Sequence, residues 1–203
     1  MKKSLVILAI LGLAVAGFAQ EKKHEIVVGG GIGTPVSPNE FTDGFKLGFD
    51  GRIGAGYFVT PKLLLGANIG FNSFALDKDF VRETGEVPAG TNVTIKGGNL
   101  RVIELAALAK YYTMPRTKTT NIYLLGGPGV GFTRLSDLSV TIPGVPTSVE
   151  VEGENETRFV FTAGAGITHR IHPTINLFVE GRYSRIFADE DASYVPVRIG
   201  VMF

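Results

Sequence analysis

The sequence predicts an all-β fold, an eight-stranded antiparallel up-and-down transmembrane β-barrel. Apolar and polar residues alternate with period two in eight segments after residue 20, which is the side-chain period of a strand. The connections between these segments alternate between short and long, as they do in barrels that cross a membrane. Glycines gather on the polar face of the segments, where a narrow lumen needs small residues.

The N-terminal segment, residues 1–19, is expected to be a cleaved signal peptide outside the fold. Two lysines precede an uninterrupted apolar run from Leu5 to Ala16, and Gly17-Phe18-Ala19 follows. This is the order of a basic region, an apolar region and a small-residue cleavage site. The alternative, a transmembrane helix, needs roughly 20 apolar residues, and the run from Leu5 to Ala16 is shorter. Residues 20–203 are then long enough for one domain.

Composition narrows the function classes. Without the two lysines of the signal peptide the chain has 18 basic and 19 acidic residues, a net charge of −1, so no nucleic-acid partner is indicated. The chain has no cysteine, which excludes disulfides and thiolate metal sites. The 27 glycines and 14 phenylalanines, with no tryptophan, suit a barrel better than a soluble enzyme.

The alternating segments define the expected strands. Phe49, Ile53 and Tyr57 share one face of the second segment, while Asp50 and Arg52 share the other. The eight strands are expected at residues 24–33, 45–57, 63–74, 99–113, 121–133, 156–171, 174–187 and 195–203.

The connections place both termini at the same end of the barrel. Short connections are expected at 60–62, 115–120 and 172–173, long ones at 34–43, 75–98 and 134–155, and a medium one at 188–193. Pro128 lies inside an expected strand and weakens the pairing predicted there, because proline lacks a ladder donor.

Glycine decides which face points inward, because a soluble lipocalin-type barrel shows the same period with its apolar face inside. Glycine costs backbone entropy in strands, so a solvent face gains nothing from it, whereas small residues in a narrow lumen make room for long charged side chains. The glycines of the polar face are Gly48, Gly54, Gly56, Gly66, Gly70, Gly127, Gly129, Gly131, Gly164 and Gly166.

The opposite, apolar face is therefore expected to contact lipid. Aromatic residues concentrate toward its strand ends, as in the girdles of membrane barrels. Its members are Phe45, Phe49, Tyr57, Ile69, Phe71, Ile103, Leu105, Tyr111, Ile122, Leu124, Phe132, Phe159, Phe161, Ile167, Leu177, Val179 and Tyr183.

Three stretches resemble the small outer-membrane β-barrel family typified by outer-membrane proteins A and X. They are Tyr123-Leu-Leu-Gly-Gly-Pro-Gly-Val-Gly-Phe132, the segment from Ala163 to Tyr183, and the terminal strand. The resemblance implies an outer-membrane β-barrel domain over 20–203, in the bacterial outer membrane and in contact with its lipid and lipopolysaccharide. It also implies an assembly signal, read by the outer-membrane assembly machinery, at Val195, Val197, Ile199, Val201 and Phe203.

The lumen is expected to hold a charged network that closes the bore. Charges removed from water must pair or lose several kcal/mol each, and eight strands enclose little space. The alternative is a polar path for ions or protons. The predicted network is Lys46, Asp50, Arg52, Glu104, Lys110, Glu180, Arg182 and Arg198.

No catalytic residue, cofactor or metal site is predicted. His24, His169 and His172 are expected at the end with the short connections, whereas Asp77, Asp79, Ser136 and Asp137 lie in long connections, so no triad can be assembled. Barrels that modify lipid A require a histidine near the outer leaflet, which makes that enzyme class the last alternative. The run from Gly29 to Gly33 does not complete a phosphate-binding glycine motif.

Four glutamates recur at every second position of the third long connection: Glu150, Glu152, Glu154 and Glu156. An extended strand would place all four on one face, and Leu138 to Thr141 with Thr147 to Val151 predicts a hairpin beyond the membrane. The row is either a solvated strand face or a patch for divalent cations or a basic partner.

These observations favour a non-enzymatic, monomeric outer-membrane barrel with a charged, plugged lumen, which serves envelope structure or presents surface loops. A small channel or porin-like protein is the first alternative. A secreted lipocalin-like binding protein is the second, and it requires the two faces of the sheet to be exchanged.

Overall fold

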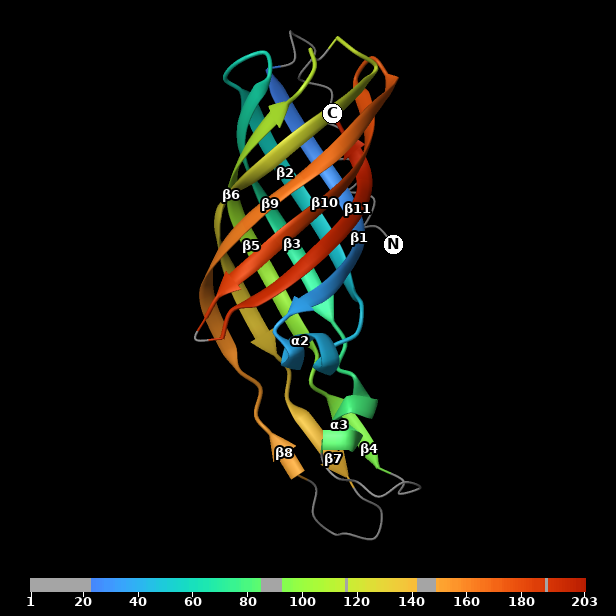
Figure 1. Cartoon of the computed structure of the whole chain (residues 1–203), viewed down its shortest axis with the longest axis vertical. Coiled ribbons are helices and arrows are strands. Elements are labelled where there is room, and N and C mark those ends of the chain that lie inside the picture. Colours follow the sequence, from blue (N-terminus) through green and yellow to red (C-terminus); the bar gives the residue numbers. More distant parts are fainter. Residues whose placement is uncertain (1–22, 85–92, 116, 142–148, 189) are drawn as a thin grey trace, which may run out of the picture.

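The computed structural model describes residues 23–84, 93–115, 117–141, 149–188 and 190–203; the predicted signal peptide lies outside them. Within these ranges the chain forms eight long barrel strands, three short strands and two short helices (Figure 1). In chain order they are β1 (His24–Ser37), α2 (Asn39–Gly44), β2 (Gly48–Phe58), β3 (Leu63–Phe74), α3 (Lys78–Thr84), β4 (Thr94–Gly97), β5 (Leu100–Tyr112), β6 (Thr120–Leu135), β7 (Leu138–Thr141), β8 (Val149–Val151), β9 (Asn155–His172), β10 (Ile175–Phe187) and β11 (Ala192–Met202).

The eight long strands close into a barrel in the order β1-β2-β3-β5-β6-β9-β10-β11, with β11 returning to β1. All pairs are antiparallel, so the predicted up-and-down barrel is confirmed. Ile26 and Phe203 extend the closing seam: the Phe203 N–H donates to the Ile26 oxygen at 2.9 Å, and the Ile26 N–H donates back at 3.2 Å. Closure removes sheet edges, and in hydrocarbon every backbone polar group must be bonded internally.

The two ends of the barrel differ. The short connections lie at the upper end in Figure 1, called the turn end below, and α2, α3, β4, β7 and β8 lie at the lower end, the loop end. In membrane barrels short turns face the periplasm and long loops face outside. Among the described residues, no helix is long and apolar enough to cross a membrane.

Along most of each barrel strand, side chains alternate between the two faces. Ile69 and Leu105 point outward and are 53% and 50% exposed, whereas Asn68 and Glu104 point inward and are 4% and 0% exposed. Large apolar side chains thus form a continuous outward band, as predicted. Phe45 is the exception, because it precedes β2 and packs edge-on against Phe41 with ring centroids 5.6 Å apart.

The first long connection contains an element that the sequence did not reveal. β1 continues to Ser37, and α2 then replaces the loop expected at 34–43. Phe41 of α2 is 6% exposed and packs edge-on against Phe74 at 5.3 Å. α2 ends at Gly44 and residues 45–47 connect it to the next strand, so β2 begins at Gly48 and not at residue 45.

A three-stranded sheet, β4-β7-β8, extends from the loop end. The predicted hairpin is confirmed where it is described: Leu138 pairs with Val151 and Val140 with Val149, while residues 142–148 lie outside the described residues. β4 joins the other edge of β7, and Ile95 is 4% exposed.

Pro128 interrupts only one side of its strand. Toward β9, pairing continues through Pro128 and Phe161. Toward β5, pairing stops at Ala106 with Gly129 and resumes in the same register at Ala109 with Gly126. The gap fits the missing N–H of proline, and the register expected from the alternation is kept.

Candidate functional site

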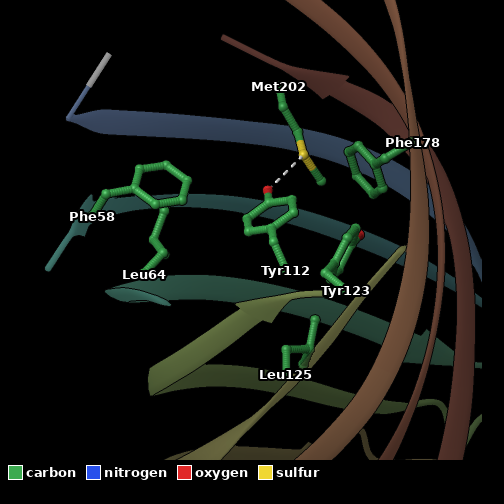
Figure 2. Close-up of a cluster of buried hydrophobic side chains, with 7 residues drawn as sticks. All are labelled: Phe58, Leu64, Tyr112, Tyr123, Leu125, Phe178 and Met202. Carbon is green, nitrogen blue, oxygen red and sulfur yellow. Dashed lines mark hydrogen bonds between the residues drawn. The ribbon is translucent and has the colours of Figure 1, made fainter. Parts of the chain in front are cut away.

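The lumen is filled by three layers of side chains. An apolar cluster lies at the turn end, a charged network lies at the centre, and a second apolar cluster lies beneath α2 at the loop end. The turn-end cluster, drawn in Figure 2, is Phe58, Leu64, Tyr112, Tyr123, Leu125, Phe178 and Met202. The loop-end cluster is Phe41, Phe74, Val102, Val160, Ile186 and Tyr194.

Seven of the eight predicted network residues lie inside the barrel. None of them is more than 5% exposed, although each carries a formal charge. They are Asp50, Arg52, Glu104, Lys110, Glu180, Arg182 and Arg198.

Lys46 does not belong to the buried network, so its predicted place there is wrong. Its side chain is 53% exposed, and its Nζ lies 3.3 Å from Asp77 Oδ1, above the loop end of the barrel. The cause is the later start of β2, since strand parity has no meaning for a residue outside the strand. The N–H of Asp79 donates to Asp77 Oδ1 at 2.9 Å, and this bond, with the ammonium of Lys46, lowers the pKa of Asp77.

Glu25 takes the place of Lys46 in the lumen. It is 8% exposed, lies 2.6 Å from Lys110 Nζ and accepts a hydrogen bond from the Tyr112 hydroxyl. Its parity with Gly29 and Gly31 could have revealed it from the sequence. With this exchange the buried network of the described residues holds four carboxylates and four cations, so its formal charge is zero.

The central layer contains two groups of ion pairs, and within each group the side chains are joined by hydrogen bonds. In the first, Arg52 forms a two-bond pair with Glu104, at 2.9 and 3.2 Å, and its Nη1 also donates to Asn68 Oδ1 at 2.5 Å. The Tyr194 hydroxyl donates to the same carboxylate at 3.1 Å. Paired guanidinium and carboxylate groups of this geometry are the strong form of a charged hydrogen bond.

In the second group, Arg198 bridges two carboxylates. It contacts Asp50 through Nε at 2.8 Å and Nη2 at 3.2 Å, and Glu180 through Nη1 at 3.0 Å. Arg182 Nε also donates to Glu180 at 2.6 Å, and the Tyr123 hydroxyl donates to it at 2.9 Å. Every lumen carboxylate therefore has at least one cationic partner.

Several glycines of the inner face lie beneath large side chains. A Cβ atom at Gly29 or at Gly200 would lie 2.7 Å from the Phe178 ring, and one at Gly70 would lie 2.8 Å from Arg52 Nη2. At Gly166 it would overlap the Tyr123 hydroxyl. At these four positions the absent side chains provide the volume that the aromatic and guanidinium groups occupy.

A cavity of about 40 Å³ lies inside the barrel beside the network, lined by Arg52, Asn68 and Arg182 among others. Within the described residues, one buried nitrogen of each of these side chains has no hydrogen-bond partner: Arg52 Nε, Asn68 Nδ2 and Arg182 Nη1. A cavity of about 60 Å³ opens at the turn end. Glu25 lines both cavities, so its pair with Lys110 lies between them.

The residues considered for catalysis do not converge. His169 Nδ1 lies 2.9 Å from Thr120 Oγ1 and His172 Nδ1 lies 3.0 Å from Thr174 Oγ1, both at the turn end. Ser136 lies at the loop end, where its Oγ accepts the N–H of Asn99 at 2.9 Å. No group of three or more potential metal-binding His, Asp or Glu residues occurs in the described part of the chain.

The four glutamates of the third connection do not share one strand face, and that expectation is wrong. β8 ends at Val151 and β9 begins at Asn155, so Glu152 and Glu154 lie between strands. Glu156 lies on β9 and forms an ion pair with Arg158. The break removes the period-two geometry on which the cation patch depended.

The C-terminal strand carries the residues of the predicted assembly signal, whose role stays a prediction. Val197 and Ile199 point outward and are 46% and 62% exposed, whereas Arg198 between them is 2% exposed. Val195, Val201 and Phe203 share the outward parity and are partly exposed.

Comparison with known proteins agrees with the barrel fold. The family model for the outer membrane protein beta-barrel domain matches residues 5–203. Neisserial surface protein A superimposes with a TM-score of 0.54 at 17% identity, covering 89% of this chain and 96% of that one. A major outer membrane protein from Thermus thermophilus gives 0.53 at 13% identity, covering 89% and 98%. No curated protein matches. With almost its whole length matched, the chain belongs to the outer-membrane β-barrel family of bacteria.

Proposed function

We propose that this protein is a closed, non-enzymatic outer-membrane barrel that holds a short extracellular sheet and helices above the membrane. The observation that carries the proposal is the burial of the lumen charges: Asp50 and Glu104 are 0% exposed and Arg198 is 2% exposed. In a water-filled bore these side chains would be accessible to solvent. Each carboxylate is instead neutralised by a neighbouring cation, as a plug requires.

Conductance across planar bilayers tests the plug. We expect the wild-type barrel to give no reproducible openings, because two apolar clusters lie on either side of the paired charges. A matched variant, Tyr123→Ala with Tyr194→Ala, removes one buried ring from each cluster and should conduct measurably. Regular openings of the wild-type protein would contradict the closed lumen.

The small-channel alternative is supported by one feature. Glu25 lines both the inner cavity and the cavity at the turn end, so loss of its pair with Lys110 would connect them. A channel gated there requires Glu25→Ala to increase conductance strongly while wild type conducts weakly. The lipocalin-like alternative requires an apolar lumen face and disagrees with the outward apolar band.

Assembly through the terminal strand gives a second test. Deletion of Phe203 removes both backbone hydrogen bonds to Ile26 at the closing seam and the terminal aromatic side chain. We expect the amount of protein in the outer membrane to fall several-fold, measured by membrane fractionation and by the mobility shift of unboiled barrel on denaturing gels. Phe203→Tyr keeps an aromatic ring and both bonds, and serves as the control; equal loss in both variants would contradict this role.

A further inference from the structure

Two exposed arginines face each other across neighbouring strands at the loop end of the barrel. Arg101 of β5 is directly paired with Arg134 of β6, and both side chains are exposed. Their parity is that of Ile103 and Phe132, which point outward with 47% exposure each. Like charges directly opposite on one sheet face destabilise the pair of strands, so this arrangement needs a counter-charge.

The arginines belong to a polar row that crosses four strands. The strand registers pair Ser73 with Arg101, Arg101 with Arg134, and Arg134 with Asn155. All four positions have outward parity, and the side chains of Ser73 and Asn155 are half-exposed and exposed. Hydroxyl and amide groups therefore flank the two guanidinium groups on the outer surface.

This row lies at the edge of the apolar band. The next outward row toward the turn end consists of Phe71, Ile103, Phe132 and Thr157, and the one after it of Ile69, Leu105, Val130 and Phe159. Because the band contacts the hydrocarbon of the bilayer, its loop-end border lies at the level of the lipid headgroups in the outer leaflet.

Carboxylates neutralise other arginines of the loop end but not these two. Arg185, also outward and exposed, is paired with Asp191, and Arg158 is paired with Glu156. Within the described ranges, neither Arg101 nor Arg134 takes part in an ion pair that would balance its charge. Since both lie in the lipid headgroup layer, an anion of that layer can supply the missing charge.

We propose that Arg101 and Arg134 form a binding site for the phosphate group of an anionic lipid in the outer leaflet. Guanidinium groups match phosphate oxygens with two parallel hydrogen bonds, and Cβ atoms of directly opposite residues lie about 4.5–5.5 Å apart. Both arginines can therefore contact one phosphate, with Ser73 and Asn155 able to donate further bonds. The site lies on the outer surface and does not depend on whether the lumen is closed.

The test compares lipid retention in nanodiscs of phosphatidylcholine with and without bisphosphorylated lipid A. Lipid that stays bound after detergent extraction is counted by native mass spectrometry. We expect the wild type to retain lipid A, and each single Arg→Gln change at these positions to weaken retention roughly tenfold, as for loss of a hydrogen bond to a charged group. Arg185→Gln, which removes an outward arginine already paired with Asp191, should retain lipid A as the wild type does.

A charge reversal separates the proposed site from a general surface effect. Arg101→Glu places a carboxylate opposite Arg134. The midpoint of thermal unfolding in phosphatidylcholine alone should therefore rise above that of the wild type, while the increase of this midpoint on addition of lipid A should disappear. If the double variant Arg101→Gln with Arg134→Gln retained as much lipid A as the wild type, that result would overturn the proposal. So would equal retention of dephosphorylated lipid A, or stabilisation by inorganic phosphate as large as that by lipid A, since the latter would identify a site for free phosphate and not for lipid.

Discussion

Replacement of Arg198 by methionine is expected to lower the free energy of unfolding by about 3–5 kcal/mol, the cost of breaking a buried ion pair from one side. Arg198 supplies two bonds to Asp50 and one to Glu180. Its loss leaves Asp50, at 0% exposure, without its cationic partner in a site that water does not reach. The measurement is urea-induced unfolding in lipid vesicles, followed by circular dichroism because the chain has no tryptophan.

The double variant Arg198→Met with Asp50→Leu is the informative control. Replacing both partners of a buried pair by apolar groups is often neutral, and Glu180 keeps its bond to Arg182. The double variant should therefore recover most of the stability that Arg198→Met loses. Arg185→Met, at an exposed pair with Asp191, should change little. If Arg198→Met were as stable as the wild type, the central network would not be dry.

Substitution of Gly166 by valine is expected to destabilise the barrel by about 1–3 kcal/mol, the usual cost of overpacking a filled interior. Gly166 lies opposite Tyr123 across β6 and β9, and a Cβ atom there would overlap the tyrosine hydroxyl. The ring must then move, and the 2.9 Å bond from its hydroxyl to Glu180 is broken. Unfolding in urea gives the change directly.

Gly181 provides the matched control on the opposite face. It lies on β10 with outward parity, and no heavy atom lies within 4 Å of a Cβ built there. Gly181→Val should leave stability unchanged or raise it, because valine loses less backbone entropy than glycine and favours strands. If the two variants were equally destabilised, the effect would come from the backbone of the strands and not from packing in the lumen.

Much of the lumen composition was predictable because the side-chain period of a strand is two. Once Asp50 and Arg52 were assigned to the face that carries Gly48 and Gly54, the same rule placed Glu104, 52 residues beyond Arg52 in the chain. The rule failed where a strand begins. Lys46 precedes β2 and lies outside the strand, whereas Glu25 at the start of β1 shares the parity of Gly29 and points into the lumen.

Which acid pairs with which base was not predictable from alternation. Arg198 and Asp50 meet over Gly31 of β1, which is paired with both of them, although they lie 148 residues apart in the chain. This contact depends on the register of β1 with β2 and on that of β1 with the closing strand β11, because each register sets the height of an inward side chain along the barrel axis. The helix α2 was not predictable either, because six residues are too few to show a helical period. Its stability comes from a tertiary contact, the packing of Phe41 on Phe74.

By itself the sequence determined the strand number, the two faces of the sheet and the end at which the long connections gather, since these follow from local alternation and from turn residues. Tertiary structure decided the pairing of the lumen charges, the closure of the loop end by α2 and the placement of Arg101 opposite Arg134. These depend on strand register and barrel stagger, which are set by the joint packing of all eight strands and not by any one segment.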